Sequence, residues 1–332
     1  MNKTFESLKK MIGNTPLLEI KFLYKGKEKR IFAKAEYFNM TGSIKDRVAL
    51  HILEKAYKEG TIKEGDIIAE ATSGNTGISF CAVGTALGHK SIIYMPDWMS
   101  SERVNLIKSF GAEIVGVSRE EGGFLGSIAM ADALEEKGGY FLPHQFTNEE
   151  NTNTHYNTTG VEIVNQLKSV GLVADACVAG VGTGGTVMGI TRRLKEANPD
   201  FKGYALEPKS SPTLSTGFKV GIHRIQGISD EFIPDILKID ELAGIVAADD
   251  GDSINMARML SSKLGIGVGV SSGANFLGCI EILNKLPDDA VVVTTFADDN
   301  KKYLSTDYSY EQPIKEDFIS KDVELLEVNC IR

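Results

Sequence analysis

The chain has 332 residues, more than one compact hydrophobic core usually serves, so two lobes are expected. An apolar content of 42% and a charged content of 24% are typical of a soluble globular protein. The formal net charge of −9 argues against a nucleic-acid or anionic-membrane partner. An anionic ligand would therefore be held by local groups such as helix N-termini.

The four cysteines are spread along the chain, at Cys81, Cys177, Cys279 and Cys330. This spacing contains no CxxC-type metal or redox motif, and we expect no metal site. Most of the cysteines lie in apolar stretches, which is typical of buried thiols. The first 14 residues have no apolar core of signal-peptide length, and no apolar run approaches transmembrane length. We therefore expect a cytoplasmic protein without a membrane partner.

Short apolar runs alternate with amphipathic stretches along most of the chain, which predicts parallel sheet covered by helices. The strand-like runs, in chain order, are residues 66–71, 91–96, 113–117, 175–180, 267–270 and 290–296. A helical stretch follows each of them except the last. The polar segment 147–158 is the best candidate for a crossover between two lobes, although a solvated loop has the same composition.

Lys45 begins an amphipathic stretch within the segment NMTGSIKDRVA, residues 39–49. A solvated surface lysine is the ordinary interpretation of such a residue. However, a cation is unfavourable at a helix N-terminus because of the helix dipole. A lysine that is covalently engaged, or whose pKa is lowered, would remove this conflict.

Three further turns rich in glycine and hydroxyl groups connect a strand to a helix, where open α/β sheets bind ligands. TSGNTG at 72–77 offers donors to a carboxylate or caps a helix, and VSSGAN at 270–275 is by itself a helix cap. GVGTGG at 180–185 can hold a phosphate or form a tight packing turn. It also matches G-x-G-x-x-G, with Glu207 roughly where a ribose-binding acid would lie, so a dinucleotide site is a serious alternative at this point.

Together these segments resemble the cysteine synthase and cystathionine β-synthase family of pyridoxal-phosphate enzymes, the fold-type II group. The matching blocks are residues 12–20, 41–47, 71–78, 144–148 with 158–163, 180–186, 225–234, 271–274 and 302–306. They occur in the family's order over nearly the whole chain. The resemblance replaces the dinucleotide interpretation, because GVGTGGT is the family's phosphate cup.

The resemblance implies an α/β fold of two open twisted sheets covered by helices, with pyridoxal 5'-phosphate in the cleft between two lobes. It implies a large cofactor-binding domain formed by residues 1–38 plus 150–332. Residues 39–149 would form a smaller, mobile substrate domain. A homodimer that acts on a small amino acid is the family expectation.

The resemblance also assigns roles to individual residues. Lys45 would carry the cofactor as an internal aldimine and remove the substrate Cα proton. The cofactor phosphate would be held by Gly182, Thr183, Gly184, Gly185 and Thr186. Asn75 would bond the ring hydroxyl, and Ser271, or Ser272 if the register differs by one, would face the pyridine nitrogen. The substrate would be bound by Thr72, Ser73, Asn75, Thr76, Gln145 and Gly227. A serine at the pyridine nitrogen leaves the ring neutral, which suits β-replacement through an aminoacrylate.

The segment QGISDEFIP, residues 226–234, departs from the family. Cysteine synthases usually read Gly-Ile-Gly-Ala-Gly-Phe-Ile-Pro and cystathionine β-synthases Gly-Ile-Gly-Tyr-Asp-Phe-Ile-Pro, in a loop beside the substrate. Here Asp230 stands in place of the alanine or tyrosine. At about 4 Å and an effective dielectric constant of about 20, its carboxylate would repel a hydrosulfide anion by several kcal/mol. It would also accept a proton from a neutral nucleophile, an effect of about 10²–10⁴-fold.

We therefore predict that Asp230 is a general base for a neutral nucleophile. With water, L-cysteine would give L-serine and hydrogen sulfide. A second cysteine would give lanthionine, and homocysteine would give cystathionine. If Asp230 faces solvent instead, an O-acetylserine sulfhydrylase is the alternative, followed by a cystathionine β-synthase or a serine/threonine dehydratase. A non-catalytic binding module is disfavoured because Lys45 and the glycine cup are retained, and a nicotinamide dehydrogenase remains only if no pyridoxal phosphate binds.

Overall fold

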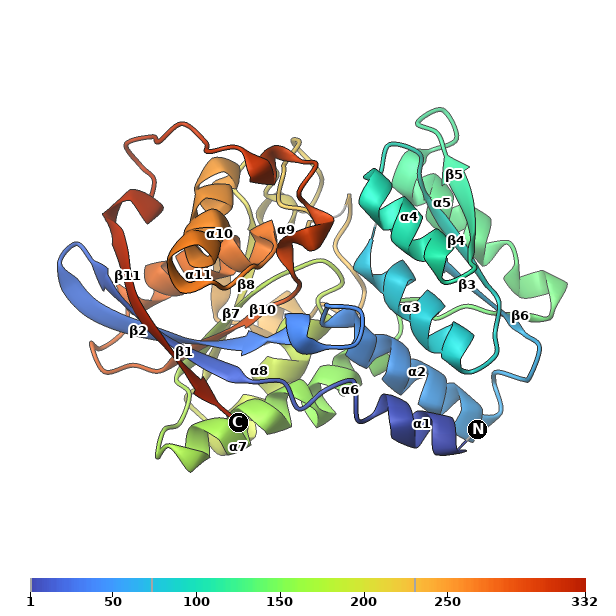
Figure 1. The fold of residues 1–332 in the computed structure, drawn as a ribbon, viewed down its shortest axis with the longest axis horizontal. Helices are drawn as coiled ribbons and strands as arrows, with labels where there is room; N and C mark the ends of the chain where they lie inside the picture. Colours follow the sequence, from blue (N-terminus) through green and yellow to red (C-terminus); the bar gives the residue numbers. More distant parts are fainter. Residues whose placement is uncertain (1, 73, 230) are drawn as a thin grey trace. The chain divides into compact units, whose positions relative to one another are not determined.

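The computed structural model describes residues 2–72, 74–229 and 231–332. The chain divides into two compact units, and Figure 1 shows their elements. The smaller unit comprises Met1–Gly13 and Asn39–Asn151, and the larger unit comprises Asn14–Phe38 and Thr152–Arg332. The sequence had placed the first 13 residues in the larger domain. They group with the smaller unit because Phe5, Leu8 and Ile12 are buried in its core. The cofactor-binding and substrate-binding roles of the two units remain predictions.

The smaller unit contains a parallel four-stranded sheet in the order β5-β4-β3-β6. Its strands are β3 (Ile67–Ala71), β4 (Ser91–Pro96), β5 (Glu113–Val117) and β6 (Tyr140–Phe141). Its helices are α1 (Asn2–Leu8), α2 (Lys45–Glu59), α3 (Asn75–Ala86), α4 (Ser101–Ser109) and α5 (Gly123–Asp132). The boundary between the units falls within α6 (Glu150–Asn157), inside the segment 147–158 that the sequence predicted as a crossover.

The larger unit contains a seven-stranded sheet in the order β11-β1-β2-β10-β7-β8-β9. Its strands are β1 (Leu17–Tyr24), β2 (Lys27–Ala35), β7 (Ala176–Gly180), β8 (Lys202–Pro208), β9 (Gly244–Ala248), β10 (Val292–Phe296) and β11 (Val323–Ile331). Its helices are α7 (Thr159–Ser169), α8 (Gly185–Ala197), α9 (Thr213–Thr216), α10 (Asp250–Leu264) and α11 (Val270–Leu283). β1 pairs antiparallel with β2 and β11, whereas the pairs from β2 to β9 are parallel.

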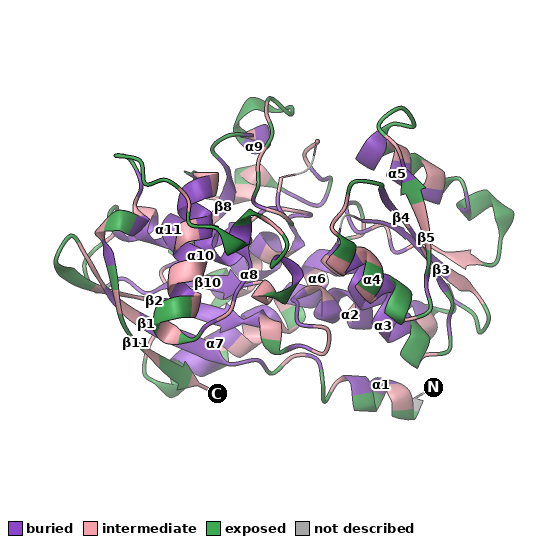
Figure 2. Ribbon diagram, turned by 45° about the horizontal axis from the view of Figure 1, so that its top comes forward, coloured by how far each residue is buried: buried purple, intermediate pink, exposed green. Residues whose placement is uncertain are grey.

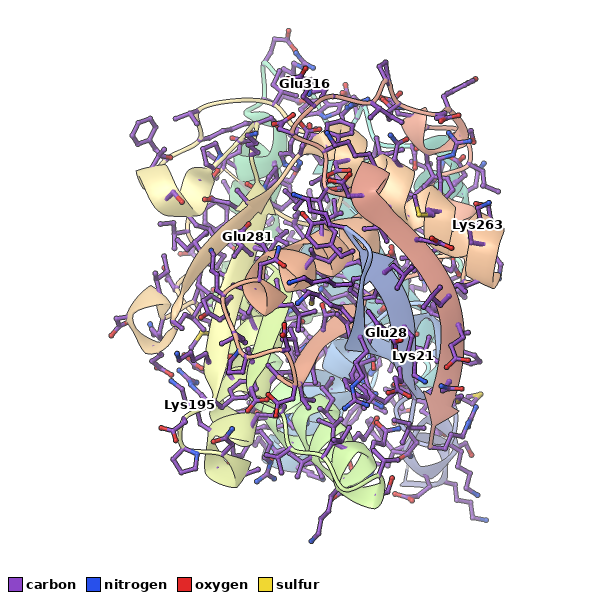
Figure 3. The ribbon with its side chains drawn as sticks, turned by 90° about the vertical axis from the view of Figure 1, so that its left-hand side faces the viewer. Lys21, Glu28, Lys195, Lys263, Glu281 and Glu316 are labelled. Atoms are coloured by element: carbon purple, nitrogen blue, oxygen red, sulfur yellow. The ribbon has the colours of Figure 1, made fainter. Side chains whose placement is uncertain are left out.

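Short 3₁₀ helices complete the chain, at Glu36–Phe38, Glu135–Lys137, Ile239–Glu241, Asn300–Lys302, Asp307–Ser309 and Ser320–Asp322. Charged side chains occupy the outward side of the β1–β2 hairpin, as Lys21 and Glu28 show in Figure 3. Lys21 forms an ion pair with Glu327 of the edge strand β11 across 2.7 Å. Such charges on an edge strand oppose pairing with a further chain.

The core of the larger unit lies on both faces of its sheet because neighbouring strand residues point to opposite sides. Leu18 of β1 and Val178 of β7 pack in the cluster that contains residues of α10 and α11. Leu17 and Cys177 pack in the cluster that contains residues of α7 and α8. Nearly all of α11 is buried (Figure 2). The sheet is therefore covered by α10 and α11 on one face and by α7 and α8 on the other.

The predicted strand at 267–270 is not a strand. Val268 makes one isolated bridge to Asp299, and α11 already begins at Val270. Gly269 instead packs closely against the segment 298–300, since a Cβ on this residue would lie 2.2 Å from an Asp298 carboxylate oxygen. Each of the other predicted runs contains an observed strand.

The prediction of buried thiols is confirmed for Cys81, Cys177 and Cys279, whereas Cys330 is exposed. Within residues 2–72, 74–229 and 231–332, no helix has both the length and the apolar character needed to cross a membrane.

Candidate functional site

Lys45 is the first residue of α2 in the smaller unit, and a buried carboxylate beside it fixes the preceding turn. Asp46 accepts hydrogen bonds from the Thr41 backbone N–H at 2.6 Å and from the Thr41 hydroxyl at 2.5 Å. It also accepts one from the Ser79 hydroxyl of α3 at 2.6 Å. The turn before Lys45 is thereby tied to both α2 and α3. The role of Asp46 was not predicted from the sequence, although an acid in the first turn of a helix is a recognisable signal.

The second predicted turn joins β3 to α3 in the same unit. The Thr72 N–H donates to the Tyr94 carbonyl of β4 at 3.0 Å, and the Gly74 N–H donates to Thr72 Oγ1 at 3.1 Å. A Cβ on Gly77 would lie 2.6 Å from the Thr72 methyl carbon, so this close contact requires glycine. Asn75 is the first residue of α3. Ser73 lies outside the described residues.

Gln145 lies at the same end of β3. The Thr76 hydroxyl donates to Gln145 Oε1 at 2.7 Å, and Gln145 Nε2 donates to the Ala71 carbonyl at 2.9 Å. The Asn151 side chain donates to the Gln145 carbonyl at 2.9 Å. The structure therefore brings Thr72, Thr76 and Gln145 together where α3 begins. A helix N-terminus with hydroxyl groups beside it suits a carboxylate.

Glu70, on β3 just before this turn, was not singled out from the sequence. Its side chain is buried, and Oε1 accepts a hydrogen bond from the Ala71 N–H at 2.9 Å. Oε2 is buried without a hydrogen-bond partner among the described residues. Burial raises the pKa of Glu70 from 4.5 to about 8, so the carboxyl group is mostly protonated at neutral pH.

The glycine cup lies in the larger unit, between the end of β7 at Gly180 and the start of α8 at Gly185. Gly184 has a φ of +89°, the left-handed region that favours glycine. The Gly185 N–H donates to Thr183 Oγ1 at 3.4 Å. The Thr186 hydroxyl lies 3.3 Å from Nε2 of His155, which is fully buried. Backbone N–H groups at the start of α8 are suited to a phosphate.

The segment before Asp230 packs directly against this cup. A Cβ on Gly182 would lie 2.7 Å from the Gly227 carbonyl oxygen, which explains the glycine at 182. The Ser229 N–H donates to the Val181 carbonyl at 2.7 Å. Asp230 itself lies outside the described residues.

The start of α11 is tied to the same region. The Gly180 N–H donates to Asn275 Oδ1 at 2.8 Å, and Asn275 Nδ2 donates to the Thr295 carbonyl at 2.8 Å. Ser271 and Ser272, in the first turn of α11, are both buried. The Ser272 hydroxyl has no hydrogen-bond partner within the described part of the chain. The larger unit thus gathers the cup, the segment 227–229 and both serines.

Comparison with known proteins identifies similar chains. A family model described as "Pyridoxal-phosphate dependent enzyme" matches residues 8–298. A cysteine synthase from Staphylococcus aureus (strain Mu50 / ATCC 700699) is 40% identical over 310 residues, which cover 93% of this chain and 99% of that protein.

Two solved structures are more similar still. A hydrogen sulfide-producing enzyme from Fusobacterium nucleatum shares 57% identity, with a TM-score of 0.97 and coverage of 100% of both chains. A variant of that enzyme, in which an aspartate is replaced by asparagine, was solved in complex with an α-aminoacrylate intermediate. It has the same identity of 57%, a TM-score of 0.97 and coverage of 99% of both chains.

Proposed function

The chain belongs to the cysteine synthase-like family of pyridoxal-phosphate-dependent enzymes, and from this premise we propose that it releases hydrogen sulfide from L-cysteine. Its cofactor is pyridoxal phosphate and its reaction class is β-elimination or β-replacement. The favoured reaction converts L-cysteine and water to L-serine and hydrogen sulfide. A second L-cysteine in place of water gives lanthionine and hydrogen sulfide. The observation that carries the proposal is the full-length similarity to a hydrogen sulfide-producing enzyme.

The residues present fit the cofactor. The amides and hydroxyls of residues 182–186, at the start of α8, suit its phosphate. The buried hydroxyl of Ser272, which lacks a partner among the described residues, suits a polar ring atom such as the pyridine nitrogen, the role predicted for Ser271. Lys45 would hold the cofactor through Nζ, and Asn75 would bond the ring hydroxyl. When bound, pyridoxal phosphate supplies the electron sink for charge that develops at the substrate Cα.

The protein's own groups bind the substrate and move its protons. We propose that the α-carboxylate binds at the start of α3, held by donors from Thr72, Ser73, Asn75 and Thr76. Gln145 orients Thr76 through their 2.7 Å hydrogen bond and completes this set. Gly227 contributes its backbone to the same substrate. Lys45 Nζ then accepts the Cα proton as the Cβ–S bond breaks, and passes it to the departing hydrosulfide, which leaves as hydrogen sulfide. After the nucleophile adds at Cβ, the proton that it releases returns to Cα through Lys45.

We further propose that Asp230 accepts a proton from the incoming water or thiol. The aspartate-to-asparagine variant of the Fusobacterium enzyme supports this role, if Asp230 is the counterpart of the substituted residue. That variant was solved with an intermediate that has lost its β-substituent and has not yet gained the nucleophile. Removing the base for the addition step favours accumulation of such a species.

O-acetylserine sulfhydrylase activity is the second candidate, because the Staphylococcus relative is a cysteine synthase with 40% identity. A cystathionine β-synthase or a dehydratase ranks below it. Negative charge on Asp230 disfavours hydrosulfide as the nucleophile, since like charges repel. A homodimer in the cytoplasm remains part of the proposal.

The test is to incubate the purified holoenzyme with L-cysteine alone and to quantify sulfide and every amino-acid product. Serine or lanthionine in amounts equal to the sulfide is the expected result. Failure to release sulfide, together with rapid cysteine formation from O-acetylserine and sulfide, would show a cysteine synthase instead. Lys45→Ala should abolish both reactions.

Asp230→Asn tests the proposed base separately. It should release sulfide in the first turnover and then slow product formation by about 10²–10⁴-fold. Glu231→Gln is the matched control, because this neighbouring acid pairs with Lys219 at 2.5 Å and should leave turnover close to that of the parent. Equal turnover in the Asp230→Asn variant and the control would exclude Asp230 as the base.

A further inference from the structure

Ser229 has an unusual backbone conformation. Its φ is +56°, in the left-handed region that non-glycine residues rarely adopt. A serine persists in this conformation only where its surroundings determine it strongly. The residue precedes Asp230 directly, so the cause of this conformation bears on the proposed reaction.

Every polar group of Ser229 is engaged. Its N–H donates to the Val181 carbonyl at 2.7 Å. Its hydroxyl donates to the Ser211 carbonyl at 3.1 Å and lies 3.3 Å from the Thr213 hydroxyl. Its carbonyl oxygen lies 3.0 Å from His223 Nε2, which therefore carries the hydrogen of this bond. Three separate stretches of the larger unit hold this one residue.

These contacts connect Ser229 to the glycine cup. Val181 directly precedes Gly182, and the neighbouring Gly227 carbonyl allows no Cβ at position 182. Ile228, between Gly227 and Ser229 in the chain, is buried and packs against Gly180. A Cβ added to Gly180 would lie 2.8 Å from an Ile228 methyl carbon. The segment 227–229 and the start of the cup thus pack as one piece, and the Ser229 N–H is bonded directly to that cup.

We propose that Ser229 is a positioning residue: it holds the chain next to Asp230 against the glycine cup and thereby supports addition of the neutral nucleophile in the second half of the reaction. This inference rests on the proposed function. The hydroxyl is the group that distinguishes serine at this position, because glycine adopts the same φ more easily but has no hydroxyl to bond. A merely structural serine would instead affect both halves of the reaction and the folded state alike.

Two variants separate these roles. Ser229→Gly accepts the left-handed conformation but loses the hydroxyl bonds, and Ser229→Ala loses the bonds and keeps the strained φ. Ser169→Ala is the matched control, because the Ser169 hydroxyl also donates to a backbone carbonyl, that of Gln166, at 2.7 Å at the end of α7. If Ser229→Ala does not fold, Ser229→Gly carries the test by itself.

The experiment follows holoenzyme and L-cysteine in single-turnover and steady-state assays, with hydrogen exchange of the peptide 226–234 as a second readout. In both Ser229 variants we expect first-turnover sulfide release within about twofold of the parent and at least about tenfold slower serine formation. Amide exchange in the peptide should be faster than in the control.

The outcomes distinguish the inference from the proposed function. A parent that releases no sulfide from L-cysteine contradicts the proposed function, and the inference with it. A parent that releases sulfide, with Ser229→Gly forming serine as fast as the control, overturns the inference alone. Equal slowing of sulfide release and serine formation also overturns it, because that result indicates a structural role.

Discussion

Glu70→Gln is a direct test of the electrostatics behind the β3–α3 turn. Burial raises the pKa of Glu70 from 4.5 to about 8. The difference of about 3.5 pH units, at about 1.4 kcal/mol each, gives about 5 kcal/mol by which folding disfavours the ionised carboxylate. Glutamine is neutral at every pH and retains an oxygen that can accept the hydrogen bond from the Ala71 N–H.

The direction in which stability changes with pH follows from proton binding. Between pH 4.5 and 8 the folded protein holds a proton on Glu70 that the unfolded chain has released. The parent therefore loses stability as pH rises through this window, with a slope of up to about 1.4 kcal/mol per pH unit, whereas the Glu70→Gln variant lacks this loss. Between pH 5 and pH 8 the free energy of unfolding of the variant should rise relative to that of the parent by about 3 kcal/mol.

Urea unfolding of both holoenzymes at pH 5, 6.5 and 8 measures this difference. Glu120→Gln, on an exposed glutamate, is the control and should show no such trend. A difference between Glu70→Gln and the parent that stays constant from pH 5 to pH 8 would refute the assignment of a buried, protonated Glu70. A difference in the free energy of unfolding that grows with pH in favour of the parent would refute this assignment as well.

Substitutions of His223, Gly182 and Asp46 test three further features of the structure. Burial lowers the pKa of His223 below 6.5, so the parent should lose stability as pH falls below that value, and His223→Gln should reduce this loss in acid unfolding curves. Gly182→Ala places a Cβ 2.7 Å from the Gly227 carbonyl oxygen and should weaken pyridoxal-phosphate binding at least about tenfold in an absorbance titration. Asp46→Ala removes the acceptor of three hydrogen bonds and should lower the free energy of unfolding by about 2–5 kcal/mol, measured with urea.

The strand-to-helix turns could be predicted because their signals are local. Apolar runs followed by glycine and hydroxyl residues located the β3–α3 and β7–α8 junctions. The antiparallel extension of the larger sheet could not be predicted in this way. β1 pairs with β11 between Leu17 and Ile331, and no local pattern reports a pairing over that separation. The prediction of a strand at 267–270 was wrong: its glycines pack closely against residues 298–300, and only one isolated bridge forms.

The site shows the same limit. The family resemblance placed Thr76 and Gln145 in the substrate site as separate residues, whereas the fold bonds their side chains to each other at 2.7 Å. The residue types indicated the chemistry of the site. The hydrogen bond between Thr76 and Gln145 could not be predicted, because the two residues are 69 positions apart in the chain. Glu70 and Asp46 were missed for a related reason. A buried carboxylate looks like a surface one until the groups around it are known.

The contacts of segment 227–229 link the glycine cup to the residues that precede the proposed base. Its backbone bonds to Val181 and leaves no room for a side chain at Gly182, so the cup cannot shift without moving the residue before Asp230. If the cup binds the cofactor as proposed, we expect cofactor binding and nucleophile addition to be energetically coupled, so substitutions in the two segments should not be additive. Gly182→Ala should therefore slow nucleophile addition even at saturating pyridoxal phosphate. Combined with Ser229→Gly, it should slow addition by less than the product of the two separate effects, since both changes release the same segment.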